Sequence, residues 1–129
     1  MNITDIETFH CSDGRRNNIF LQVHTDEGIV GVGEPYTIGP DEGVLALVDS
    51  IKPWFVGQDP ARIEWIWHHI YRRSSVSGIW RMAGPVWMSA LAGIDIALWD
   101  IKGKALGVPI YELLGGMRPG REKIRVYAS

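Results

Sequence analysis

The sequence predicts an α+β fold in which an antiparallel β-meander is followed by a helical bundle. Three observations lead to this prediction. Apolar and polar residues alternate near the N-terminus with the period of pleated strands. From Pro40 onward, apolar residues recur at helical spacing between prolines and glycines. The segment 85–106 is apolar around its whole circumference, which is typical of a central helix.

Composition narrows the class of protein. The chain has 129 residues, a formal net charge of −2 and one cysteine, Cys11. That length suits one ordinary domain. Interspersed charge of both signs gives no electrostatic basis for binding nucleic acid or a membrane. A single cysteine excludes an internal disulfide, so we expect a reducing, cytoplasmic setting. We expect neither a secretory signal nor a membrane span, because no apolar run has the required length and flanks.

The meander is expected to contain three strands. Residues 2–9 and 18–25 have strand character, and a loop at 11–17 joins them. Residues 25–28 (TDEG) form a turn, because the glycine can adopt a positive φ. Residues 29–34 then return as the third strand.

Two helices are expected after the meander. The first lies within 39–54, where a proline and acidic residues mark the start and Pro53 marks the end. The second lies within 58–73, with Asp59 as its N-cap and Pro60 as its first residue. Arginines at its C-terminal end suit the negative pole of the helix dipole.

A long helix is expected from Pro85 to Leu106, closed by Gly107. Residues 108–116 add a short helical turn. The last residues, 124–129, alternate as a new strand that has no partner in the sequence, which indicates part of a larger fold.

The charges in the long helix are interpreted as structural. Lys102 and Lys104 point about 200° apart on a helix, so they cannot converge on one substrate atom. Asp100 and Lys104 have the spacing of a favourable ion pair. Asp95 shares another face with Lys102, where a second ion pair can form.

Glycines in the long helix point to close packing. Gly93 and Gly103 each cost about 1 kcal/mol relative to alanine inside a helix. The close approach of a neighbouring element would explain why both are present.

The segment ALAGIDIALWDIKGKALGVPIYELLGG (90–116) resembles the N-terminal signature of the mandelate racemase and muconate lactonizing enzyme group, within the enolase superfamily. The agreement extends over nearly the whole chain, through DEGIVGVGEP (26–35) and GQDPARIE (57–64). Together, GEP, GQDP and ALWDIKGK look most like the sugar-acid dehydratases, such as the D-galactonate dehydratases. The matching residues of the first segment are Ala90, Gly93, Asp95, Ala97, Asp100, Gly103, Lys104, Pro109, Leu113, Leu114 and Gly115.

The resemblance implies an enolase N-terminal domain-like capping domain at 1–123 and the first strand of a (β/α) barrel at 124–129. In that family the barrel binds Mg²⁺ through three carboxylates, and a Lys or His base removes the proton α to the substrate carboxylate. Dehydratases then lose water. All of these groups would lie beyond Ser129, so no catalytic or metal-binding residue is assigned here, and the fragment alone is expected to be inactive.

The implied role of a capping domain is to close over the barrel mouth and contact the distal end of the substrate. The loop with Arg15 and Arg16 is a candidate, because arginine offers several donors to a polyhydroxy acid. Ile38 occupies a place where related mannonate dehydratases have asparagine, which argues against that substrate. The candidate substrate-binding residues are Arg15, Tyr36, Trp80, Arg81 and Ser129.

Three functions remain open on the sequence. The first is the cap of an acid-sugar dehydratase, with an acid sugar as its partner and a homo-oligomer as the full-length protein. The second is a racemase or cycloisomerase of the same superfamily, which only the barrel residues can distinguish. The third is a free-standing binding module, which would be stable without a barrel.

Overall fold

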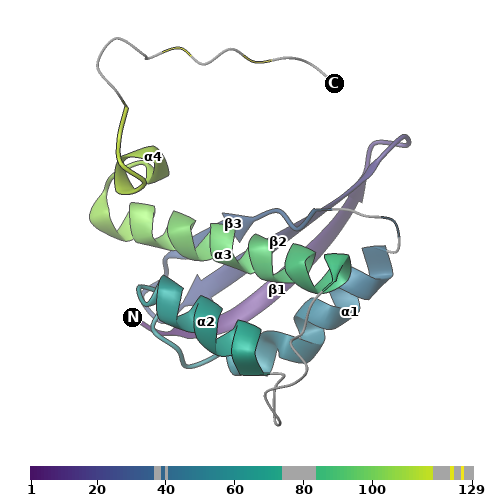
Figure 1. Cartoon of the computed structure of the whole chain (residues 1–129), viewed down its shortest axis with the longest axis horizontal. Coiled ribbons are helices and arrows are strands. Elements are labelled where there is room, and N and C mark those ends of the chain that lie inside the picture. The colour runs from purple at the N-terminus through teal and green to yellow at the C-terminus, as the bar shows by residue number, and fades with distance from the viewer. Residues whose placement is uncertain (37–38, 40, 74–83, 118–122, 124–125, 127–129) are drawn as a thin grey trace.

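The computed structural model of the chain describes residues 1–36, 39, 41–73, 84–117, 123 and 126. A three-stranded antiparallel sheet in the order β1-β2-β3 is followed by helices, so the α+β prediction is confirmed. Figure 1 shows α1, α2 and α3 on the same side of the sheet. The elements are β1 (Ile3–Ser12), β2 (Asn17–Thr25), β3 (Val30–Gly33), α1 (Asp41–Ile51), the 3-10 turn η1 (Lys52–Trp54), α2 (Ile63–Arg73), α3 (Pro85–Leu106) and α4 (Ile110–Leu113).

The hydrophobic core lies between the sheet and the helices. Alternate residues of β2 face it, as strand periodicity requires. The helix α3 packs against β2, β3, α1, α2 and α4, which confirms its predicted central position. Fully buried core residues include Ile19, Leu21 and Val23 of β2, Val44 and Val48 of α1, Ile66 and Ile70 of α2, and Leu91, Ile94, Leu98 and Ile101 of α3.

The strand β3 and the residues after it lie directly against α3. A Cβ atom added to Gly33 would overlap the carbonyl oxygen of Gly93. A Cβ atom added to Gly93 would lie 2.5 Å from Cγ of Pro35. One added to Gly103 would lie 2.9 Å from the carbonyl oxygen of Val108, where the chain turns back after α3. The predicted close approach at Gly93 and Gly103 is therefore confirmed.

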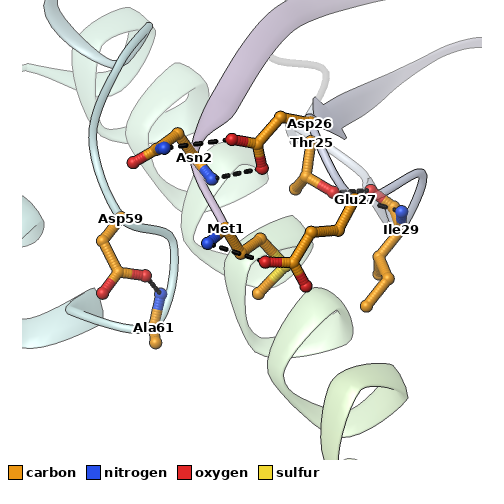
Figure 2. Close-up of polar contacts among 8 residues, drawn as sticks. All are labelled: Met1, Asn2, Thr25, Asp26, Glu27, Ile29, Asp59 and Ala61. Carbon is orange, nitrogen blue, oxygen red and sulfur yellow. Dashed lines mark hydrogen bonds and ion pairs between the residues drawn. The ribbon is translucent and has the colours of Figure 1, made fainter.

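The start of β1 is tied to the turn between β2 and β3 (Figure 2). The N-terminal amine lies 2.8 Å from Oε1 of Glu27, and the backbone N–H of Asn2 donates to Oδ1 of Asp26 at 2.7 Å. Thr25 closes the turn, because its hydroxyl donates to the Ile29 carbonyl at 2.8 Å. These contacts hold the first residues of the chain against the turn between β2 and β3.

The predicted start of the second helix is wrong. The helix α2 begins at Ile63, and its first helical hydrogen bond runs from the Ile66 N–H to the Arg62 carbonyl at 2.9 Å. Asp59 instead closes a turn, in which its Oδ1 accepts the Ala61 N–H at 3.0 Å (Figure 2). An Asp-Pro pair favours turns as well as helix starts, and here Pro60 is buried beneath the turn.

The predicted first barrel strand at 124–129 lies outside the described residues except for Val126, which is assigned to no strand. The structure therefore does not test the boundary placed at residue 123.

Candidate functional site

The loop between β1 and β2 lies at the same end of the sheet as the start of α1 (Figure 1). A depression of about 380 Å³ lies between them. Its described lining consists of Arg16, Asn17, Tyr36, Gly39 and Asp41. The site therefore combines a cation, an amide, a phenol and a carboxylate, which together can donate to and accept from a polyhydroxylated ligand.

The loop wall is built around Asp13. Its Oδ1 accepts the backbone N–H groups of Arg15 at 2.8 Å and Arg16 at 2.6 Å. These bonds, the one from Arg16 first, lower the pKa of the Asp13 carboxyl group. The Ser12 hydroxyl accepts the Gly14 N–H at 3.2 Å. The loop is thus closed by its own hydrogen bonds.

The opposite wall is fixed by α3. The Ser89 hydroxyl donates to the backbone carbonyl of Tyr36. The preceding Pro35 sits against Gly93, one helical turn further along α3. The Tyr36 side chain is 73% exposed, so its phenol is available to a ligand. The long helix therefore holds the backbone of this wall and leaves the side chain free.

Asp41 connects the two walls. It begins α1 and is only 4% exposed, although it carries a carboxylate. Its Oδ2 lies 3.2 Å from Nε2 of His10, which reaches it from β1. The positive end of the α1 dipole also favours an anion at this position. The contact joins the stem of the β1–β2 hairpin to the start of α1.

The depression includes some of the predicted residues and not others. Tyr36 lines it, and so does Arg16, whereas the neighbouring Arg15 is not among the described lining residues. Trp80, Arg81 and Ser129 lie outside the described residues, as does Ile38. The role of these residues as substrate contacts stays a prediction.

Sequence reasoning missed Asn17, His10 and Asp41. From the sequence alone, Asp41 indicates only the start of a helix. Its partner is 31 residues away in the sequence, and no local pattern indicates the pairing.

The charges of α3 lie away from this depression. Lys104 Nζ is 2.7 Å from Oδ2 of Asp100, so the predicted ion pair is confirmed. Lys102 Nζ lies 5.1 Å from the centre of the Trp99 ring. No ion pair joins Lys102 to Asp95 among the described residues, because seven helical positions separate them by about 10 Å along the axis. Within the described ranges, no cluster of three or more His, Cys, Asp or Glu residues could hold a metal ion.

No helix in the described part of the chain is long and apolar enough to cross a bilayer.

Two curated relatives match nearly the whole of this chain and are much longer than it. D-galactonate dehydratase of Pectobacterium atrosepticum is 51% identical over 99% of this chain and 31% of its own length. The enzyme of the same name from Verminephrobacter eiseniae is 47% identical over 98% of this chain and 31% of its own length. The chain thus spans about a third of the length of these curated relatives.

Solved structures of longer proteins also superpose on most of this chain. An enolase of Pantoea ananatis with bound D-gluconate and Mg is 42% identical and superposes with a TM-score of 0.79, covering 89% of this chain and 27% of that one. A putative galactarate dehydratase of Agrobacterium radiobacter, with bound Na and L-malate, is 34% identical with a TM-score of 0.81, covering 90% and 28%. The family described as the mandelate racemase / muconate lactonizing enzyme N-terminal domain matches residues 5–115. This chain therefore belongs to that family, within the enolase superfamily, as its sequence motifs predicted.

Proposed function

We propose that this chain is the capping part of an acid-sugar dehydratase. The observation that carries the proposal is the 51% identity to a D-galactonate dehydratase over 99% of the chain. The relative crystallised with bound D-gluconate supports a sugar acid as the class of substrate. The reaction is removal of the proton α to a carboxylate followed by loss of water.

The depression contributes binding rather than chemistry. The Arg16 guanidinium and the Asn17 amide donate to hydroxyl oxygens at the end of the sugar acid remote from its carboxylate, while the Tyr36 phenol can donate or accept. Asp41 accepts from a substrate hydroxyl or holds its neighbours in place. Closing this wall over the substrate excludes water from the reacting carbon. Trp80, Arg81 and Ser129 are proposed as further contacts, and Arg15 as an outer member of the same loop.

The described residues do not form a magnesium site. A bound Mg²⁺ would stabilise the negative charge that develops when the α-proton leaves. We place its ligands, and the acid and base groups, in the part of the relatives' length that this chain does not match. Residues 124–129 would form the first strand of the (β/α) barrel that holds these groups. We also propose that the complete protein is a cytoplasmic homo-oligomer.

The test uses the complete protein in which residues 1–129 occur, with residues 1–129 alone as the control. Each is incubated with Mg²⁺ and a panel of acid sugars that includes D-galactonate and D-gluconate, and formation of the 2-keto-3-deoxy acid is measured. We expect turnover by the complete protein and none by residues 1–129. Exchange of the α-proton in D₂O without loss of water would instead identify a racemase. Turnover by residues 1–129 alone would overturn the assignment of the chain as a cap.

A further inference from the structure

We propose that His10 is a positioning residue, which sets the separation of the two walls of the depression through its contact with Asp41. The inference rests on the proposed function for its consequence in catalysis, and on the geometry of the described residues for the contact itself. His10 does not line the depression among the described residues.

The first step is the burial of Asp41. A carboxylate that is 4% exposed is costly unless a donor satisfies it. Among the described residues, Nε2 of His10 lies 3.2 Å from its Oδ2. The contact is a hydrogen bond to a carboxylate in the His10 tautomer that carries its proton on Nε2, because a carboxylate oxygen accepts. The donor requirement therefore ties the start of α1 to β1.

The second step is the stiffness of the loop wall. His10 pairs with Ile19 across the hairpin, two residues before β1 ends at Ser12. The loop that follows is closed by Asp13, which accepts from the amides of both Arg15 and Arg16. A shift of the hairpin stem relative to α1 would thus carry the Arg16 backbone with it.

The third step is the independence of the opposite wall. The Tyr36 backbone is anchored to α3 by Ser89, and the Asp41 amide donates to the Gly39 carbonyl at 2.9 Å. The anchor on α3 does not involve the hairpin. The His10–Asp41 contact is therefore the described polar link that joins the hairpin stem to the start of α1, and with it the two walls.

The test compares three substitutions of His10 in the complete protein. In His10→Gln, the side-chain amide can place an N–H donor close to the position of Nε2, whereas Asn is one methylene shorter and Ala has no donor. We expect His10→Ala and His10→Asn to raise KM for the sugar acid about tenfold, which corresponds to about 1.4 kcal/mol. We expect kcat to stay within about twofold, and His10→Gln to restore KM. His68→Ala removes an exposed histidine of α2 and serves as the matched control.

Backbone amide hydrogen exchange tests the positioning role of His10 without a measurement of activity. Peptides that contain Arg16 or Asp41 should exchange faster in His10→Ala than in the wild type, while peptides from the middle of α3 should not. Unchanged exchange in those peptides, or equal KM values for the Gln and Asn variants, would overturn the positioning role. If the wild-type protein turns over no sugar acid, the proposed function fails, and the exchange result still decides whether His10 holds the walls.

Discussion

The backbone N–H of Val32 donates to Oδ2 of Asp100 at 2.8 Å, across 68 residues of sequence. Val32 lies in β3, an edge strand of the sheet that pairs with β2 on one side only. Lys104 completes the arrangement, because its Nζ donates to the Val30 carbonyl at 2.7 Å. The ion pair of α3 therefore satisfies backbone groups of an edge strand, which would otherwise be open to pairing with another chain.

Removing this edge contact should destabilise the chain. We expect Asp100→Ala to lower the free energy of unfolding by about 1–2 kcal/mol, because it leaves the Val32 N–H without its charged acceptor. Urea unfolding measures the change. Asp100→Asn keeps a carbonyl acceptor and loses only the partly exposed ion pair with Lys104, so it should cost about 0.5 kcal/mol. An Asn variant as unstable as the Ala variant would show that the ion pair, and not the edge hydrogen bond, is the stabilising contact.

Two glycine substitutions in helices should have opposite effects. In Gly93→Ala the new Cβ atom would lie 2.5 Å from Pro35 Cγ, so we expect a loss of about 2 kcal/mol despite the better helix propensity of alanine. In Gly43→Ala the nearest atom is 3.9 Å away, on Val86, so we expect a gain of up to about 1 kcal/mol. Thermal unfolding of the two variants measures both changes in stability. Stabilisation by Gly93→Ala would contradict the close approach of Pro35 to α3.

Asp95 should make stability depend on pH in the acidic range. Burial against α2 raises the pKa of its carboxyl group above the ordinary value of 3.8, and repulsion by Glu64 adds to the shift, while a hydrogen bond with Trp99 opposes it. The folded state then binds this proton more tightly than the unfolded state. The contribution of Asp95 to the free energy of unfolding therefore falls as pH rises from its unfolded-state pKa through its raised folded-state pKa.

We expect Asp95→Asn to remove this decline. Urea unfolding between about pH 3 and pH 7 should show the variant gaining stability relative to the wild type as pH rises, then levelling off once Asp95 is ionised in the folded wild-type protein. A relative stability that instead falls with rising pH would mean that the folded state favours the ionised carboxylate.

Local sequence patterns predicted much of the fold. The Asp100–Lys104 pair follows from helical spacing, and the bounds Pro85–Leu106 follow from a proline at one end and a glycine at the other. The glycines of α3 correctly indicated close packing. By contrast, the Asp59-Pro60 pair suits both a turn and a helix start, and the choice depends on tertiary packing that no local pattern encodes.

The site could be predicted only in outline. The loop and Tyr36 were expected near the substrate, and the structure brings Tyr36 together with Arg16 rather than Arg15. Which of two adjacent arginines faces the depression depends on the loop conformation set by Asp13. The His10–Asp41 contact joins a strand to a helix and could be found only from the folded structure.

The substitution Arg16→Gln in the complete protein tests the central claim most directly. If the depression binds the distal end of a sugar acid, loss of the guanidinium should raise KM about tenfold or more and leave kcat within about threefold, because the reacting carbon lies elsewhere. Arg62→Gln, which removes an arginine stacked on Trp65 of α2, should change neither constant. An unchanged KM in Arg16→Gln, or an equal increase in Arg62→Gln, would contradict the assignment of this depression to the substrate.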